Sequence, residues 1–195
     1  MNLFTLLAPF YDCFMAALHK RQGEILLAKL TPLGGRKVLD LGGGTGRLAA
    51  RLAKAGANVY LLDSSAAMLK RAHRLLPGNR IVLGDASSLP FAENSFDLVI
   101  IVDALHHFRR QQAALLEAFR VLVPGGTLAI LDFNRKSVAV KILARLERLV
   151  LEPALFLTAE QLEKLLAENG FVNLQTEMIS AHQYLMTVSK PLPSP

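Results

Sequence analysis

The sequence has a single cysteine, Cys13, among its 195 residues. One thiol permits no internal disulfide and no zinc cluster, so no metal site is predicted. Although 52% of the residues are hydrophobic, no segment reaches the roughly 18 consecutive apolar residues that a membrane-spanning helix needs. The apolar start, Met1 to Phe10, lacks a basic n-region and is broken by Pro9 and Asp12. Neither a signal peptide nor a membrane span is predicted, so the default expectation is a cytoplasmic protein.

The charge is not balanced, because 22 Lys and Arg residues face 16 Asp and Glu residues, which gives a net charge of +6. An excess of this kind suits an anionic partner such as nucleic acid, lipid head groups or an acidic substrate, but moderately basic enzymes are common. The chain also lacks repeats and low-complexity tracts. Its length predicts one domain over residues 1–190, with Pro191–Pro195 as a disordered tail.

The glycine-rich turn Asp40–Gly46 lacks the fingerprints of two common nucleotide sites. It follows the apolar run Lys37–Leu39 and precedes a helix-like stretch, as in sheets that bring backbone close to a cofactor. A dinucleotide fingerprint counted from Gly42 would need a third glycine where Arg47 stands, and no G-K-[ST] follows the turn. The spacing is D-x-G-x-G-x-G, and Asp40 would be a poor neighbour for a pyrophosphate.

Short apolar runs alternate with helical stretches from Lys37 onward, which predicts a mostly parallel, doubly wound α/β sheet with helices on both faces. The predicted strands cover Val38–Leu41, Asn58–Leu62, Ile81–Leu83, Phe96–Val102, Thr127–Asp132, Val172–Met178 and Tyr184–Val188. The predicted helices cover Arg47–Ala55, Ala66–Leu75 and Gln111–Leu122. The last two strands are expected to form an antiparallel hairpin at the edge of this seven-stranded sheet.

Four further segments complete the predicted organisation. Residues 1–30 are expected to form a helical cap, and the tight turn Pro124-Gly125-Gly126 is expected to lead into the fifth strand. Residues 135–157 are predicted as a helical insert or lid. Thr158 and Gln161 resemble a capping box for a helix that ends before Gly170.

Acidic residues fall at or near the carboxyl ends of five predicted strands, where open α/β sheets bind ligands. They are Asp40, Asp63, Asp85, Asp103 and Asp132. Asp63 suits a carboxylate that grips ribose hydroxyls; alternatively it caps the next helix, which Ser64 or Ser65 could do instead. Asp85 could accept a hydrogen bond from an adenine amino group, with a plain turn aspartate as the alternative.

These segments resemble the motifs of class I S-adenosylmethionine-dependent methyltransferases. Val38–Gly46 looks like motif I, and Asp63 matches the acidic motif II. Gly84–Ala86 is similar to the adenine loop, Phe96–Phe108 to motif IV, and Arg120–Gly126 to the turn after the following helix. In this order they point to the methyltransferase type 11-like group, which includes ubiquinone/menaquinone-biosynthesis methyltransferases, and the resemblance covers nearly the whole chain.

The resemblance implies S-adenosyl-L-methionine as the cofactor, a Rossmann-like fold, and a glycine turn that passes the methionine half of the cofactor. The cofactor-binding residues predicted on this basis are Tyr11, Asp40, Gly42, Gly44, Gly46, Asp63, Ser64, Asp85, Ala86 and Asp103. In similar enzymes a tyrosine such as Tyr11 closes over the cofactor carboxylate. Its alternative is a half-buried aromatic side chain.

His106 and His107 follow the fourth predicted strand and could face the methyl acceptor, with Asp103 in the same loop. A carbon or oxygen acceptor has a proton to lose, which a nearby base could take. These three residues are therefore the catalytic candidates. The alternative for each histidine is the start of a helix held by ordinary hydrogen bonds.

The substrate prediction rests partly on a missing motif. Enzymes that methylate exocyclic amino groups of nucleobases usually carry Asn/Asp-Pro-Pro-aromatic after strand four, where this chain has Val102–Leu105. Cys13 also lies far from that region, so nucleic acid is an unlikely substrate. Because Arg135–Leu157 is rich in apolar residues, the predicted acceptor is a small hydrophobic or aromatic molecule. The alternatives are a nucleic-acid methyltransferase and a non-catalytic cofactor-binding or scaffold protein of the same fold.

Residues 135–151 also predict a peripheral membrane contact. Five basic residues and one acid, Glu147, accompany the apolar positions of this amphipathic stretch between Arg135 and Arg148. A helix of this type can lie at an anionic lipid surface. The alternative is a lid packed on its own domain with a solvated outer face.

Overall fold

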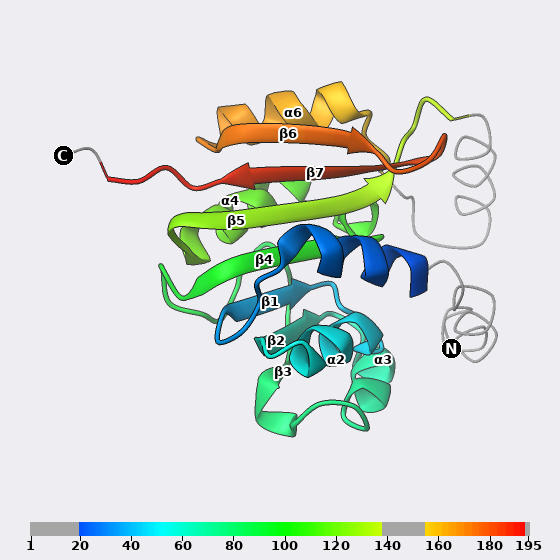
Figure 1. The fold of residues 1–195 in the computed structure, drawn as a ribbon, viewed down its shortest axis with the longest axis vertical. Coiled ribbons are helices and arrows are strands. Elements are labelled where there is room, and N and C mark those ends of the chain that lie inside the picture. Colours follow the sequence, from blue (N-terminus) through cyan, green and yellow to red (C-terminus); the bar gives the residue numbers. More distant parts are fainter. Residues whose placement is uncertain (1–19, 138–154, 194–195) are drawn as a thin grey trace.

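The computed structural model describes residues 20–137 and 155–193 (Figure 1). The predictions about Tyr11, about the first part of the helical cap and about most of the 135–157 insert concern residues outside these ranges. Residues 20–30, the described part of the cap, are helical as predicted. Within the described ranges, no helix is long and apolar enough to cross a membrane.

Seven strands form one sheet in the order β3-β2-β1-β4-β5-β7-β6. Their bounds are β1 Lys37–Leu41, β2 Asn58–Asp63, β3 Ile81–Leu83, β4 Phe96–Val102, β5 Leu122–Phe133, β6 Val172–Met178 and β7 Gln183–Ser189. The pairs among β1 to β5 are parallel, and β7 runs antiparallel to both β5 and β6. The predicted doubly wound, mostly parallel sheet and its edge hairpin are therefore confirmed.

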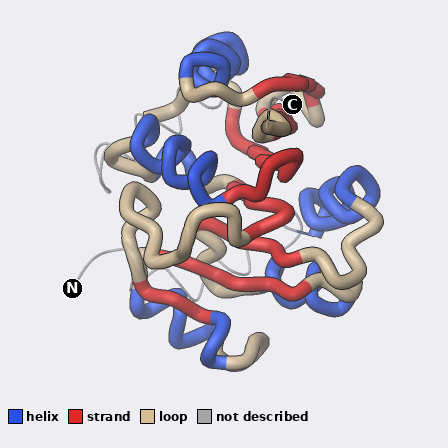
Figure 2. The backbone as a smooth tube through the Cα atoms, turned by 90° about the vertical axis from the view of Figure 1, so that its left-hand side faces the viewer, coloured by secondary structure: helices blue, strands red, loops and turns tan. Residues whose placement is uncertain are grey.

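Helices cover both faces of this sheet (Figure 2). Their bounds are α2 Arg47–Lys54, α3 Ala66–Ala72, α4 Gln111–Val121 and α6 Ala159–Glu168, with short 3-10 helices η1 Gly78–Arg80 and η2 Leu105–His107. One apolar core joins the sheet to residues 20–30, α2 and α3, and the other joins it to α4 and α6. Because β4 is covered on both sides, its sequence is almost continuously apolar instead of alternating.

Two predicted boundaries were wrong by more than one residue. Helix α3 ends at Ala72 and not at Leu75, which is half exposed and so gains little from continuing the helix. Strand β5 begins at Leu122, five residues before the prediction, and Pro124–Gly126 form a bulge within it and not a turn before it. Gly125 has a φ of +76° at this bulge, and its N–H donates to the carbonyl oxygen of Lys190.

The late helix follows its sequence signals closely. The Thr158 hydroxyl accepts from the Gln161 N–H, and the Gln161 side chain accepts from the Thr158 N–H, which completes the predicted capping box. Gly170 follows the helix with a φ of +85°, a conformation that favours glycine at a helix end.

Candidate active site

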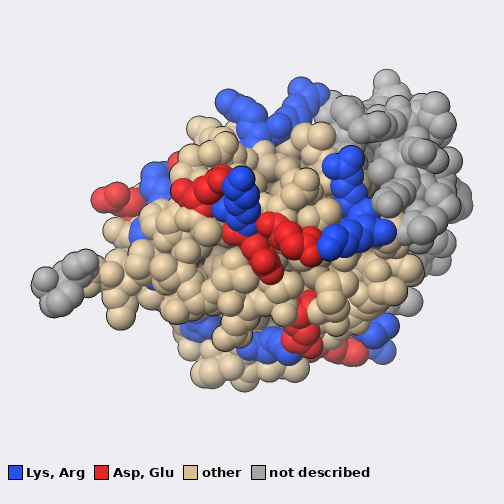
Figure 3. Space-filling model, turned by 90° about the horizontal axis from the view of Figure 1, so that it is seen from above, with Lys and Arg blue, Asp and Glu red and all other residues tan. Residues whose placement is uncertain are grey.

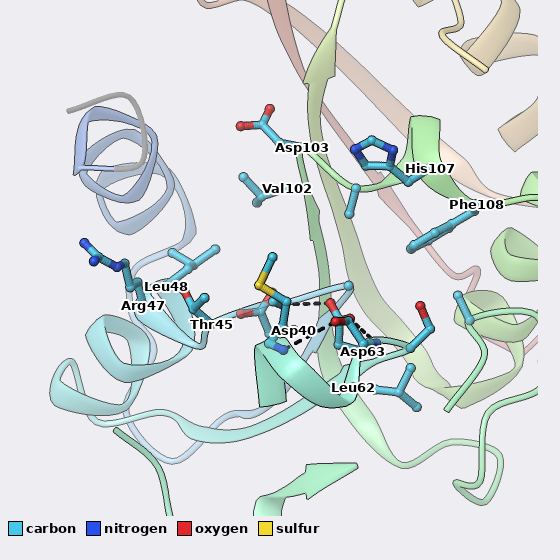
Figure 4. A pocket seen from close by; sticks show the side chains of 18 of the residues that line it. Asp40, Thr45, Arg47, Leu48, Leu62, Asp63, Val102, Asp103, His107 and Phe108 are labelled. Atoms are coloured by element: carbon cyan, nitrogen blue, oxygen red, sulfur yellow. Dashed lines mark hydrogen bonds between the residues drawn. The ribbon is translucent and has the colours of Figure 1, made fainter. Parts of the chain in front are cut away.

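A cavity of about 1440 Å³ lies at the carboxyl ends of β1, β2 and β4. Asp40 and Asp63 line one end, and Asp103, His107 and Phe108 line the other (Figure 4). Parallel strands end on the same edge of a sheet, which explains why residues so far apart in sequence meet here. Tyr11 lies outside the described residues. Of the other predicted cofactor-binding residues, all but Gly46 line this cavity.

The glycine turn folds back on β2, because the N–H groups of Gly42 and Gly43 donate to the carbonyl oxygen of Leu62. Gly42 has a φ of +76°, and a Cβ there would lie 2.7 Å from the Cβ of Ala104. Gly44 also has a positive φ, +54°, but a Cβ there would meet nothing within 4 Å. Gly42 is thus required for close packing, whereas Gly44 leaves the backbone open toward the cavity. Gly46, with a φ of +77°, starts helix α2.

The Asp63 carboxylate is oriented by the turn that it faces. Its Oδ2 accepts from the Gly44 N–H at 2.9 Å and its Oδ1 from the Ser65 N–H at 2.8 Å. Helix α3 is capped by Ser65, whose hydroxyl accepts from the Met68 N–H, so Asp63 does not serve as its cap. Burial raises the pKa of Asp63 despite these hydrogen bonds. Both oxygens remain able to accept further hydrogen bonds from a ligand.

Asp40 is more deeply buried, with 2% of its surface exposed. Its Oδ2 has no hydrogen-bond partner within residues 20–137 and 155–193. Burial and the neighbouring Asp63 raise the pKa of Asp40 to about 7. A second carboxylate beside Asp63, with an unsatisfied oxygen, makes this end of the cavity strongly favourable for hydrogen-bond donors and positive charge.

The adenine-loop residues also reach the cavity, with Ala86 buried and Asp85 exposed. Asp85 Oδ1 accepts from the N–H and the hydroxyl of Ser87, and Arg110 lies 3.5 Å from Oδ2. The bonds from Ser87 lower the pKa of Asp85. Asp85 therefore stabilises its own turn, as in the alternative hypothesis of a plain turn aspartate. It also lines the cavity, where a ligand could reach it.

Asp103 follows β4 in a left-handed conformation with a φ of +48°, which costs a non-glycine residue roughly 1–3 kcal/mol. Its Oδ2 accepts from Gln22 Nε2 at 2.5 Å, and its Oδ1 accepts from Gln183 Nε2 at 3.1 Å. Burial and the neighbouring Asp132 raise the pKa of Asp103 to about 7, while Gln22, His106 and Gln183 act in the opposite direction.

The two histidines occupy different surroundings. His106 is 3% exposed, its Nδ1 lies 2.6 Å from Asp132 Oδ1, and its ring stacks on Phe156 at 4.4 Å. His107 lines the cavity, and its ring centre lies 4.1 Å from that of His106. The side chain of His107 is exposed at the cavity, but partial loss of solvation and the neighbouring His106 lower its pKa to about 4 against the effect of Asp132, so His107 is neutral at pH 7. Of the pair, only His107 is in a position to contact an acceptor in this cavity.

Four residues near the catalytic candidates were not predicted. Phe156 brings the end of the predicted insert against the histidines, and the N–H of Leu155 donates to the His106 carbonyl oxygen. Gln22 and Gln183 approach Asp103 from 81 and 80 residues away. No local sequence pattern marks these contacts.

The donor and acceptor groups of this cavity fit S-adenosylmethionine. Asp63 offers a carboxylate already oriented by backbone N–H groups, as a ribose diol requires. Gly44 leaves open space beside it, and Asp40 Oδ2 is an unsatisfied acceptor. A pyrophosphate, by contrast, would meet two carboxylates.

Comparison with known proteins identifies the class. Residues 39–130 match the family of the methyltransferase domain. The predictions of a class I S-adenosylmethionine-dependent methyltransferase domain and of S-adenosylmethionine as its cofactor are thereby confirmed.

Two curated relatives are similar over most of this chain. The first is the ubiquinone/menaquinone biosynthesis C-methyltransferase of Roseobacter denitrificans, with 39% identity over 69% of this chain and 58% of the relative. The second is the demethylmenaquinone methyltransferase of Renibacterium salmoninarum, with 37% identity over 68% of this chain and 57% of the relative. The chain thus spans somewhat more than half the length of these relatives.

A structural comparison supports the fold. A chain of the complex that contains the Haloferax volcanii Trm112 methyltransferase activator superposes with a TM-score of 0.82, covering 94% of each chain at 19% identity. This degree of identity shows a shared fold only.

Proposed function

We propose that this chain transfers the methyl group of S-adenosylmethionine to a small hydrophobic or aromatic molecule. The observation that carries the proposal is that Asp63, which suits a ribose, shares one cavity with the apolar Phe108 and the neutral His107. The curated relatives are named for methyltransferases of quinone biosynthesis, so a phenolic or quinol ring is the first acceptor class to test.

The cofactor supplies a methyl group on a positively charged sulfur. The chain has to hold donor and acceptor in line and keep water away, and this positioning can provide much of the rate. Val102, Ala104 and Phe108 line the same cavity with apolar side chains, against which an aromatic ring could pack. His107 is neutral and can accept the proton that such an acceptor loses. His106 is held by its hydrogen bond to Asp132 and by stacking on Phe156. Its ring packs against the His107 ring and so helps to fix the position of His107.

A small acceptor also agrees better than nucleic acid does with the face of the molecule shown in Figure 3. On the face in Figure 3, Lys and Arg side chains are interspersed with Asp and Glu and form no continuous basic patch. Nucleic-acid binding depends on such a patch to neutralise successive phosphates.

The test is a methyl-transfer assay with mass-spectrometric detection, using phenols, quinols, long-chain lipids and single-stranded RNA as acceptors. We expect a methylated product from the aromatic or lipidic group, and less of it from Asp63→Ala than from the parent at a limiting cofactor concentration. Methylation of RNA alone, or of no acceptor despite cofactor binding, would contradict the proposal and favour the nucleic-acid or the non-catalytic alternative.

A further inference from the structure

The Asp103 carboxylate is buried without a recorded cationic partner. Its two oxygens accept from the side-chain amides of Gln22 and Gln183, which are neutral donors. None of the ion pairs recorded for residues 20–137 and 155–193 includes Asp103. A buried carboxylate is stabilised most by a donor that is itself positively charged. The two amides are neutral and do not compensate its charge.

Gln22 presents an unsatisfied acceptor next to this carboxylate. The residue is 2% exposed, and its Oε1 has no hydrogen-bond partner in the part of the chain that the structure describes. Gln22 lines the cavity, whereas Gln183, which makes the equivalent bond to Asp103, does not. The free oxygen of Gln22 and the Asp103 carboxylate are held together by their 2.5 Å hydrogen bond.

The glycine turn packs against the residue that follows Asp103. A Cβ at Gly42 would lie 2.7 Å from the Cβ of Ala104, the residue after Asp103. A ligand that passes along the turn is therefore carried toward Asp103 and Gln22. Asp103 and His107 lie at the same end of the cavity, but the Asp103 carboxylate is turned away from the His107 ring (Figure 4).

We propose that Gln22 is a ligand-recognition residue, whose carbonyl oxygen together with the Asp103 carboxylate accepts the N–H bonds of the protonated amine at the amino-acid end of S-adenosylmethionine. An ammonium group has three donors and one positive charge, which satisfies the free oxygen and compensates the buried carboxylate at once. A neutral hydroxyl would supply one donor and no charge. The inference rests on the proposed function.

The charges around Asp103 agree with this assignment. Burial and Asp132 on β5 raise the pKa of Asp103 to about 7, whereas Gln22, His106 on η2 and Gln183 lower it. A cation in contact would stabilise the ionised form further. Gln22 lies outside residues 39–130, the segment that matches the methyltransferase domain, so this part of the site belongs to the N-terminal helix.

The test compares two ligands by calorimetry on the full chain. S-adenosylhomocysteine carries the amine, and 5′-deoxy-5′-methylthioadenosine keeps the nucleoside and sulfur but lacks the amino-acid end. The variants are Gln22→Met, Gln183→Met, and Gln112→Met as a control on the exposed side of α4. The ratio of the two affinities in one sample does not depend on the fraction of folded protein.

We expect Gln22→Met to weaken S-adenosylhomocysteine binding by roughly 10- to 100-fold and to leave methylthioadenosine binding unchanged. Gln183→Met removes a hydrogen bond to Asp103 but no ligand contact, so it should change the ratio of the two affinities less. Gln112→Met should not change this ratio. Gln22→Lys is a second variant, because its own ammonium would take the place of the ligand amine and should also lower the ratio.

Each other outcome is decisive. If the parent binds S-adenosylhomocysteine and Gln22→Met leaves the ratio unchanged, the inference is overturned and the proposed function stands. If Gln22→Met and Gln183→Met lower the ratio equally, Gln22 acts only by holding Asp103. If the parent binds neither ligand, the proposed function fails as well.

Discussion

Replacing Asp103 by asparagine should stabilise the fold at high pH while weakening the site. The carboxyl is buried, and its pKa rises from 3.8 to about 7 in the folded chain. The folded state therefore prefers the protonated form, so the stability contribution is fully present below pH 3.8 and is lost as the pH rises through 7. The difference between the two pKa values corresponds to roughly 4 kcal/mol of unfolding free energy.

Part of this unfolding free energy is already lost at pH 5, because the carboxyl of the unfolded chain is ionised there. About 2.5 kcal/mol should remain to be lost between pH 5 and pH 8. His107 acts in the opposite direction up to its ordinary pKa of 6.5, because its pKa is lowered to about 4 and the folded state therefore favours the neutral ring as the pH rises. The parent curve alone is therefore not informative, and the quantity to measure is the difference between Asp103→Asn and the parent.

The assay is urea unfolding of both proteins at several pH values. The stability of Asp103→Asn relative to the parent should increase from pH 5 to pH 8 by about 2 kcal/mol, and the introduced amide can donate to Gln22 once the Gln22 amide rotates. Asp97→Asn, at a partly exposed carboxylate on β4, is the matched control. A pH-independent difference would show that Asp103 does not titrate in this range, and the electrostatic account of the site would be wrong.

Three further predictions concern binding, turnover and membranes. Asp63→Ala should weaken S-adenosylhomocysteine binding by roughly 10- to 150-fold, and unchanged calorimetric affinity would remove Asp63 from the site. His107→Gln should lower kcat by about 10²- to 10⁴-fold with nearly unchanged cofactor affinity, and a loss of only a few-fold would return the histidine to a structural role. Residues 135–151 should bring the protein to anionic vesicles at low salt, with each nearby Lys or Arg adding about 1 kcal/mol and with loss of binding at high salt. Sedimentation that is the same for the parent and for Lys141→Gln/Arg145→Gln/Arg148→Gln would leave this segment as a pocket wall.

The sequence predicts those parts of the fold whose signals are local. The apolar runs of β3, β4 and β6 match the observed strands end to end, and the Thr158 capping box starts α6 as expected. Ser65 caps α3, which removes the alternative role of Asp63. In each case the decisive hydrogen bonds or apolar contacts join residues close in sequence or follow from periodicity.

The rest depends on contacts that no local pattern encodes. His106 and His107 are adjacent, and only the 3-10 geometry of η2 decides that one meets Asp132 and the other the cavity. The Pro124–Gly126 bulge depends on pairing with Lys190 from the end of the chain. An amide such as Gln22 in an amphipathic helix is unremarkable until its distant partner is known.

The organisation of the site follows from this division. The glycine turn and Asp63 orient each other through bonds spanning only 19 residues, so they can form within the β1–α2–β2 unit alone. Asp103 instead needs Gln22 from the N-terminal helix and Gln183 from the last strand before its carboxylate is satisfied. Residues 39–130 therefore contain the carboxylate but neither of its amide partners. A ligand that contacts Gln22 and Asp103 together would therefore also stabilise the packing of that helix against the rest of the site.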